Sequence, residues 1–347
     1  MLIQQVSVIG AGSWGTALAL LLTRNGLQVT LYGRKINQWA AQRVNRYLSE
    51  IILPDTIRLT DNLQLAMDTQ LVLFAQPSYT LGEFVRTHQA ALNQVGRFVW
   101  ACKGLGHVVD DTADDRLIER STNHSTGELL STVAHQALGR HTQLAVISGP
   151  NFAAEVAADQ PTATTVAADS IDFAQTVAQC LHHGQFRAYS STDLIGVQIA
   201  GALKNPLAIA SGILTALNYG ANAQAALLTR GMAEITRLGL AMGAQMDTFL
   251  GLAGMGDLVL TCTDNQSRNR RLGALLGQGL TLEAAMTRIG QAVEGTRSVQ
   301  VACELAQRHG VELPIMQQVK RILYESLPLQ QAVEELMSRY QKPERLR

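Results

Sequence analysis

The sequence has no excess of either charge. It contains 28 basic and 28 acidic residues, so its formal net charge is zero at pH 7. Proteins that bind nucleic acid or anionic lipid over a broad surface carry a basic excess, which this chain lacks. We therefore expect no nucleic-acid partner, and any site for an anionic ligand must be built locally.

Cysteine is scarce and scattered. The four cysteines, Cys102, Cys180, Cys262 and Cys303, are far apart and form no CxxC pair. This pattern fits buried, reduced thiols better than a disulfide framework or a zinc site. We expect a cytoplasmic protein without a bound metal.

Long uninterrupted apolar segments are also missing. Residues 1–10 lack the basic start and the apolar run of a signal peptide, so we expect none. The most apolar stretch, residues 194–217, is interrupted by Gln198 and by Lys204-Asn205-Pro206. Because a charge and a proline at its centre disfavour a membrane span, we interpret it as a buried core helix and expect no stable membrane insertion.

What the sequence does contain is an α/β pattern followed by a helical one. With 347 residues, 47% of them hydrophobic, the chain is long enough for two cores. Up to about residue 190, short apolar runs alternate with helical patterns, which predicts a mostly parallel sheet. The strands are expected at residues 6–9, 28–32, 71–75, 98–102, 144–148, 163–167 and 186–189.

The pattern changes after Ser190-Ser191-Thr192-Asp193, a run of residues that favour helix N-caps. From there to the C-terminus the signals are helical. The fold prediction is therefore a Rossmann-type, mostly parallel sheet domain at residues 1–191, followed by an all-helical C-terminal domain at residues 192–347.

A glycine-rich turn marks the first βα unit. Gly10, Gly12 and Gly15 form a GxGxxG pattern that follows an apolar strand and opens a helix. In dinucleotide-binding folds these glycines permit the tight turn, the approach of the pyrophosphate and close helix packing, and the helix N-terminus faces the phosphate charge. We predict a site for NAD(H) or NADP(H) rather than an ordinary glycine-rich turn.

The end of the second strand bears on the choice between these cofactors. NAD-specific proteins place an acidic residue there, whereas this chain has Gly33-Arg34-Lys35. A guanidinium forms charge-assisted bonds to a 2′-phosphate, so we expect NADP(H) to be accepted. A solvated basic pair at a helix start would explain the same residues. Residues 75–78, at the end of a later strand, are expected at the same ligand-binding edge of the sheet.

Two lysines are candidates for the chemistry. Lys204 interrupts an apolar helical segment, and burial makes a lysine ammonium easier to deprotonate, as an acid/base requires. Taken alone, however, a snorkelling or salt-bridged structural lysine explains Lys204 better. Lys103 directly follows a strand at the ligand-binding edge, and an ordinary basic loop residue explains it equally well.

Seven short motifs occur in order along the chain: GAGSWGTALA at 10–19, CKGL at 102–105, SGPNFAAE at 148–155, LKN at 203–205, GLAGMGDLVLTC at 251–262, SRNR at 267–270 and VEG at 293–295. Together they resemble the NAD(P)-dependent glycerol-3-phosphate dehydrogenases along nearly the whole chain. The resemblance implies reversible interconversion of dihydroxyacetone phosphate and sn-glycerol 3-phosphate, run as reduction to feed glycerophospholipid synthesis.

The resemblance also implies roles for individual residues. Lys204 corresponds to the catalytic acid/base, and Asp257 to an aspartate that holds Lys204 and a substrate hydroxyl in register. The other positions that correspond to substrate contacts are Lys103, Gly149, Asn151, Ser267, Arg268 and Asn269. Beside the three glycines, those that correspond to cofactor contacts are Ser13, Trp14, Arg34, Lys103, Ala153, Arg268, Ala292 and Glu294.

Two of these positions depart from the family pattern. Asn151 stands where Ser or Thr is usual, and Ala292 where Val is common. Asparagine still donates and accepts hydrogen bonds, so substrate binding remains the prediction. Without the resemblance, Asp257 is also explained as a helix N-cap, Glu294 as a surface charge and Trp14 as packing.

Two other functions fit the same architecture: another NAD(P)-dependent hydroxyacid dehydrogenase, and a non-enzymatic NAD(P)-sensing protein. Residues 267–271 concentrate three arginines before a helical stretch, which favours a small phosphate substrate over a hydroxyacid. A sensor would not need Lys204, Asp257 and Lys103 together. The oligomeric state stays open, with a homodimer as one option.

The expected contact of Arg34 with a 2′-phosphate makes a direct prediction. Arg34→Asp should weaken NADPH binding far more than NADH binding, because one charge-assisted contact contributes about 1.5 to 3 kcal/mol, or about tenfold to a hundredfold in affinity. Fluorescence titration with each cofactor measures the difference. Equal losses for both would show that Arg34 does not contact that phosphate.

Overall fold

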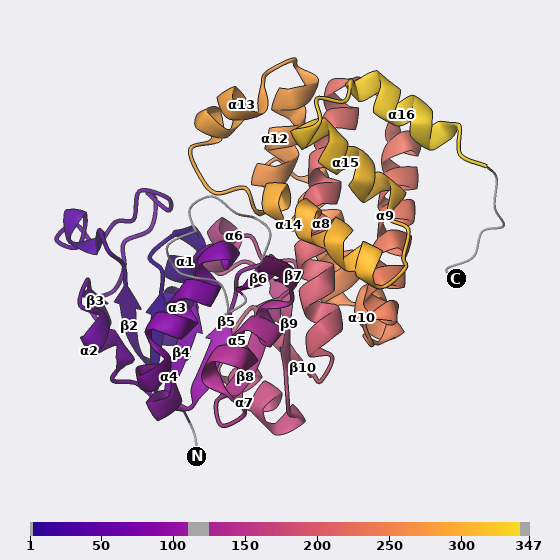
Figure 1. Cartoon of the computed structure of the whole chain (residues 1–347). Coiled ribbons are helices and arrows are strands. Elements are labelled where there is room, and N and C mark those ends of the chain that lie inside the picture. Colours follow the sequence, from indigo (N-terminus) through magenta and orange to yellow (C-terminus); the bar gives the residue numbers. More distant parts are fainter. Residues whose placement is uncertain (1–2, 110–124, 341–347) are drawn as a thin grey trace, which may run out of the picture. The chain divides into compact units, whose positions relative to one another are not determined.

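The computed structural model describes residues 3–109 and 125–340, and the chain forms two compact units (Figure 1). Unit 1 comprises residues 1–102 and 134–197, and unit 2 comprises residues 103–133 and 198–347. Unit 2 thus includes residues 103–133, which the sequence placed in the first domain. The division of the chain into two domains at residue 191 remains a prediction.

Unit 1 is built on an eight-stranded sheet in the order β10-β9-β8-β5-β4-β1-β2-β3. All neighbouring strands are parallel except β8 and β9. The strands are β1 (Gln5–Ile9), β2 (Gln28–Tyr32), β3 (Ile57–Thr60), β4 (Leu71–Phe74), β5 (Arg97–Trp100), β8 (Gln143–Ser148), β9 (Thr162–Ala168) and β10 (Phe186–Ser191). The mostly parallel sheet is confirmed. The sequence missed β3, because the exposed Arg58 interrupts its apolar residues.

The central strands β1, β4, β5 and β8 are buried on both faces, as expected for a sheet covered by helices on both sides. One face packs on α1 (Ser13–Arg24), α6 (Ala153–Ala157) and α7 (Ile171–Leu181) through a single apolar cluster. On the other face, the rings of Phe74 and Phe98 pack with Phe84 of α3 (Leu81–Thr87), 5.0 and 6.4 Å away. The remaining elements are η1 (Ile36–Gln38), α2 (Leu63–Met67), η2 (Ser78–Thr80) and α4 (Gln89–Val95).

Unit 2 combines one hairpin with a set of helices. The hairpin pairs β6 (Gly106–Val109) with β7 (Ser125–Glu128), and the sequence did not predict it. The helices are α9 (Ala221–Ala241), α10 (Met246–Leu250), α11 (Asp257–Thr263), α12 (Arg268–Gly277), α13 (Leu282–Ile289), α14 (Glu294–Arg308), α15 (Pro314–Tyr324) and α16 (Leu329–Met337). Two further helices, α5 (Leu130–Leu138) and α8 (Leu194–Ala216), each begin in one unit and end in the other.

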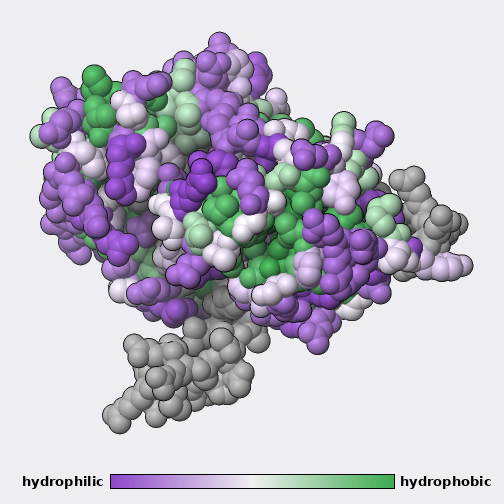
Figure 2. All heavy atoms as spheres, turned by 90° about the horizontal axis from the view of Figure 1, so that it is seen from above, coloured by the Kyte–Doolittle hydropathy of each residue, from purple (hydrophilic) through white to green (hydrophobic). Residues whose placement is uncertain are grey.

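Residues 193–340 contain helices and no strand, so the helical C-terminal part is confirmed. Helix α8 has the length and composition to cross a membrane, but 78% of its apolar window is buried in the structure. It continues through Pro206, which agrees with the buried core helix expected at residues 194–217. On the face drawn in Figure 2, hydrophilic residues separate smaller hydrophobic areas.

A buried carboxylate ties two helices of unit 2 together. Glu234 of α9 is 3% exposed, and its two oxygens accept from the backbone N–H groups of Ile315 at 2.7 Å and Met316 at 3.2 Å. These N–H groups lie in the first turn of α15, where no intrahelical partner exists for them. Burial nevertheless raises the pKa of Glu234 to about 7, against the two backbone bonds that lower it.

This shift predicts how stability depends on pH. Because Glu234 binds a proton more tightly when folded, its contribution is full below pH 4.5 and is lost as the pH rises toward about 7. Glu234→Gln cannot ionise, so the difference in unfolding free energy between wild type and variant should change by about 3 kcal/mol across that window. Urea unfolding at several pH values measures it. A difference that is constant with pH would contradict the assignment.

Candidate functional site

Buried charges gather around Asp257 in unit 2. Asp257 is 1% exposed and is the first residue of α11, directly after a π-helical turn, Leu252–Gly256. Such turns are frequent at functional sites. This turn needs a glycine at position 254, because a Cβ there would lie 2.2 Å from the carbonyl oxygen of Phe249. The GLAGMGD motif therefore serves to present the carboxylate.

Two lysines share the Asp257 carboxylate. Lys204 of α8 is 5% exposed, and its Nζ donates to Oδ1 of Asp257 and, at 2.6 Å, to Oγ1 of Thr261. The Nζ of Lys103 lies 2.9 Å from the other oxygen, Oδ2. Thr261, one helical turn after Asp257, also donates to Oδ1 at 3.3 Å. The result is a buried cluster of two ammonium groups, one carboxylate and one hydroxyl.

The cluster holds a proton that is released near neutral pH. Burial lowers the pKa of Lys103 to about 7, and the charge of Lys204 acts in the same direction. Asp257 opposes both effects. One carboxylate balances only one of two buried cations, so loss of the proton from Lys103 relieves an unbalanced charge.

A chain of side-chain amides joins this cluster to two other helices. Asn205 donates to the carbonyl of Lys103 at 2.8 Å, and its Oδ1 accepts from Nδ2 of Asn269 at 3.0 Å. Asn269, the second residue of α12, accepts in turn from the N–H of Gly295 in α14 at 2.9 Å. The backbone of Lys103 and the starts of α12 and α14 are therefore held in fixed relation.

The arginines of residues 267–271 make different contacts. Ser267 caps α12 by accepting from the N–H of Arg270, and Arg268 is the first residue of that helix. The guanidinium of Arg268 approaches Gln291, next to Ala292 and shortly before Glu294 at the start of α14. Arg270 instead donates to the carbonyl of Cys262 at 2.9 Å and holds the end of α11. Arg268 is therefore the arginine that lies beside the 291–294 segment.

In unit 1 the glycine-rich turn has the packing that its pattern predicts. A Cβ on Gly15 would lie 1.9 Å from the carbonyl oxygen of Gly10, so no larger residue fits. Gly12 is the N-cap residue of α1, and Ser13 begins the helix without a side-chain cap. The orphan N–H groups of this helix start are suited to an anion. Trp14 donates from Nε1 to the carbonyl of Ala101 at 3.1 Å, so it also serves packing.

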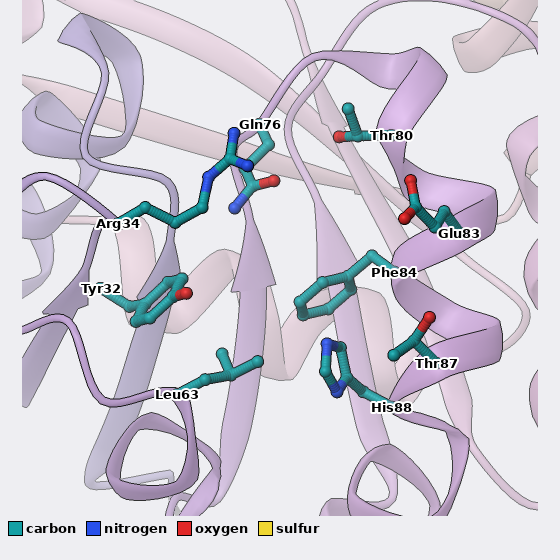
Figure 3. A pocket seen from close by; sticks show the side chains of 9 residues that line it. All are labelled: Tyr32, Arg34, Leu63, Gln76, Thr80, Glu83, Phe84, Thr87 and His88. Atoms are coloured by element: carbon teal, nitrogen blue, oxygen red, sulfur yellow. The ribbon is translucent and has the colours of Figure 1, made fainter.

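Arg34 lies in a pocket at the carboxyl edge of the sheet. The pocket is open to solvent. Figure 3 shows Arg34 reaching toward Gln76, with helix α3 across the pocket from Tyr32. The lining residues are Tyr32, Arg34, Leu63, Gln76, Thr80, Glu83, Phe84, Thr87 and His88. Apolar rings with a few charged groups suit a nucleobase and its ribose.

The segment after β8 holds the other three candidates of unit 1. Asn151 is 8% exposed and donates from Nδ2 to Oγ1 of Thr164 at 3.2 Å. Gly149 lies so close to the same residue that a Cβ would be 2.9 Å from its Cα. Ala153 begins α6. Asparagine in place of Ser or Thr thus makes a side-chain bond to the neighbouring strand.

The structure brings the predicted residues together within each unit. Lys103, Lys204, Asp257 and Asn269 belong to one network in unit 2, and the glycine-rich turn and Arg34 lie at one edge of the sheet in unit 1. The sequence missed Thr261, although its position one helical turn after Asp257 was a usable signal. It also missed the pocket residues of α3, which no motif marks.

Comparisons with known proteins agree across both units. Family models describe the N-terminus of NAD-dependent glycerol-3-phosphate dehydrogenase over residues 5–174 and its C-terminus over residues 193–334. The chain is 48% identical to glycerol-3-phosphate dehydrogenase (NAD(P)+) from Pseudoalteromonas translucida, over 98% of each chain. It is 46% identical to that of Yersinia pestis, over 98% of this chain and 97% of the relative.

A solved structure is similar throughout. Glycerol-3-phosphate dehydrogenase from Coxiella burnetii superposes with a TM-score of 0.87 at 40% sequence identity. The match covers 97% of this chain and 99% of that one.

The buried cluster makes a prediction about Lys103. The chain has only five lysines, at positions 35, 103, 204, 320 and 342, so NMR of lysine-labelled protein is easily assigned, with Lys103→Arg as the reference. The side-chain signal of Lys103 should titrate with a midpoint near pH 7, because burial disfavours its ammonium form. A midpoint close to the ordinary value of 10.5 would contradict the geometry described.

Proposed function

The chain belongs to the NAD-dependent glycerol-3-phosphate dehydrogenase family, and we infer that it interconverts dihydroxyacetone phosphate and sn-glycerol 3-phosphate with NAD(P)H. The observation that carries this proposal is the buried cluster of Lys103, Lys204 and Asp257. Carbonyl reduction needs a positioned proton donor, and the cluster holds two ammonium groups away from bulk water.

Lys204 is the acid/base of the proposed reaction. In reduction its ammonium gives a proton to the C2 oxygen of the substrate, and in oxidation its free amine takes that proton back. Asp257 and Thr261 accept from and orient the same Nζ, so the proton has a fixed position before the substrate arrives. Such preorganisation lowers the cost of reaching the transition state.

Lys103 has a second role in the proposal. Its ammonium binds Asp257 at 2.9 Å, while its backbone carbonyl is held by Asn205. With a pKa of about 7 it exchanges its proton at physiological pH. We therefore propose that it balances the charge of the cluster when Lys204 changes protonation state, and its correspondence to a substrate contact of the family makes it a proposed substrate ligand as well.

The substrate phosphate is assigned to the start of α12. Ser267, Arg268 and Asn269 combine a helix N-terminus, a guanidinium and a side-chain amide, which together suit a dianion. Gly149 and Asn151 are the proposed substrate contacts of unit 1. Binding energy from the phosphate orients the carbonyl, so dihydroxyacetone should be a poor substrate.

The residues of unit 1 fit a dinucleotide. The tight turn at Gly10, Gly12 and Gly15 admits a pyrophosphate against the uncapped start of α1, and Arg34 borders a pocket that suits adenosine. Ser13, Trp14, Ala153, Lys103, Arg268, Ala292 and Glu294 are the further proposed contacts. When bound, the nicotinamide cofactor supplies or accepts the hydride at C2.

The composition and the burial of α8 also bear on where the protein works in the cell. We propose a cytoplasmic enzyme that runs as a reductase and supplies sn-glycerol 3-phosphate for glycerophospholipids. Scattered cysteines, a neutral charge and a buried α8 support a location in the reducing cytoplasm without membrane insertion. A homodimer is the proposed assembly, which light scattering would test.

One assay separates this function from its alternatives. Oxidation of NADPH and of NADH is followed separately with dihydroxyacetone phosphate, with dihydroxyacetone, and with small 2-keto and 3-keto acids. Turnover with the phosphate alone supports the proposal. Turnover with the keto acids instead would favour a hydroxyacid dehydrogenase, and cofactor binding without any turnover would favour a sensor.

The role of Lys204 predicts a separation of catalysis from binding. Lys204→Ala should lower kcat by about a hundredfold or more while NADPH affinity stays near normal, because proton transfer matters in the transition state alone. Steady-state kinetics and fluorescence titration on the same preparation measure both quantities. Retained turnover would refute the assignment.

A further inference from the structure

One buried amide links the β2–β3 connection, residues 33–56, to the glycine-rich turn. Asn45 is 1% exposed, and its Nδ2 donates to the carbonyl of Ala11 at 3.0 Å and to Oγ1 of Thr16 at 2.7 Å. Its Oδ1 accepts from the N–H of Tyr47 at 3.0 Å. Both ends of the amide are therefore engaged, and two of its three bonds reach the turn or the first helical turn after it.

The bond to Ala11 controls the direction of a neighbouring donor. The carbonyl of Ala11 and the N–H of Gly12 belong to one peptide unit, and in a planar trans peptide these groups point in opposite directions. By holding the carbonyl, Asn45 sets the direction of the N–H at the N-cap of α1. Its bond to Thr16 fixes the first turn of the same helix, where partial positive charge collects.

Hydrogen bonds and apolar packing hold the β2–β3 connection in place, so the position of Asn45 is fixed. The guanidinium of Arg43 donates to the carbonyls of Leu53 at 2.9 Å and Ile57 at 2.6 Å, and the N–H of Leu53 returns a bond to the carbonyl of Arg43. Leu48 and Leu53 are buried in the core of unit 1. At the start of the connection, a Cβ on Gly33 would lie 2.6 Å from the Cβ of Ala11, so the backbone itself approaches the turn.

We propose that Asn45 is a positioning residue for the pyrophosphate of the cofactor. It acts through the peptide between Ala11 and Gly12, whose N–H it aims, and through the start of α1. The inference rests on the proposed function, because it assumes that this turn binds NADP(H). Arg34 lies near the start of the same connection. Asn45 therefore also links the residue proposed to bind the 2′-phosphate to the turn proposed to bind the pyrophosphate.

Comparing the affinities for two ligands distinguishes a positioning role of Asn45 from general support of the fold. NADPH carries the pyrophosphate, whereas 2′-AMP carries only the adenosine and the 2′-phosphate that Arg34 is proposed to bind. Asn45→Ala should raise the Kd of NADPH by about tenfold and change that of 2′-AMP by less than about twofold, the loss expected for one oriented hydrogen bond. Asn45→Asp should weaken NADPH at least as much, because it sets an acceptor against the carbonyl of Ala11.

Asn25 provides a matched control in the same unit. Its Nδ2 also donates to two backbone carbonyls, those of Gln179 and Cys180, both at 2.8 Å, but at the other end of α1. Asn25→Ala should lower the melting temperature about as much as Asn45→Ala and leave the Kd of NADPH unchanged.

The remaining outcomes would overturn the inference. Parallel losses for NADPH and 2′-AMP in Asn45→Ala would show that Asn45 merely maintains the fold, and an unchanged NADPH Kd would show that it does not position the turn. A wild-type chain that binds no NADPH would refute the proposed function itself, which separates that failure from failure of the inference.

Discussion

The buried carboxylate of Asp257 is the constraint on which the site in unit 2 depends. Two lysine side chains with little solvent exposure meet on its two oxygens. Without this anion, both ammonium groups would be desolvated and would repel each other, a cost that a folded protein avoids by losing protons or by moving side chains. The chain therefore builds a π-helical turn with an obligatory glycine to bring the carboxylate into place.

Side-chain amides connect the cluster around Asp257 to neighbouring helices of unit 2. Asn205 and Asn269 connect the backbone of Lys103 to α12 and α14, so Arg268 and Glu294 begin helices whose starts are already fixed. In unit 1 the corresponding constraint is steric and lies in the backbone. There Gly10 and Gly15 leave no room for a Cβ, and Asn45 holds the carbonyl of Ala11 from outside the turn. Buried charges therefore position the candidate residues of unit 2, whereas close backbone packing and an oriented peptide position those of unit 1.

The sequence predicted much of the fold because its signals are local. Strands buried on both faces read as apolar runs, and the turn at Gly10 is confirmed in packing and in its place between β1 and α1. Family motifs identified Lys204 and Asp257, which the structure shows in contact. Taken alone, neither residue indicated its partner, because the two are 53 positions apart in the sequence and meet only through tertiary folding.

What the sequence did not predict depends on long-range or weak local signals. Strand β3 and the two strands of the β6–β7 hairpin lack the run of three or more apolar residues that marks the equally short β4 and β5. The partners of Asn45 and the backbone bonds of Glu234 are tertiary contacts that composition cannot indicate.

Asp257→Asn is the variant that shows whether one carboxylate positions the proton donor for carbonyl reduction. This substitution keeps the shape of the side chain and removes its charge. We expect kcat for reduction of dihydroxyacetone phosphate to fall by about a hundredfold or more while the Kd of NADPH stays within about twofold. A variant that retains wild-type turnover would contradict it, because the lysines would then need no shared anion.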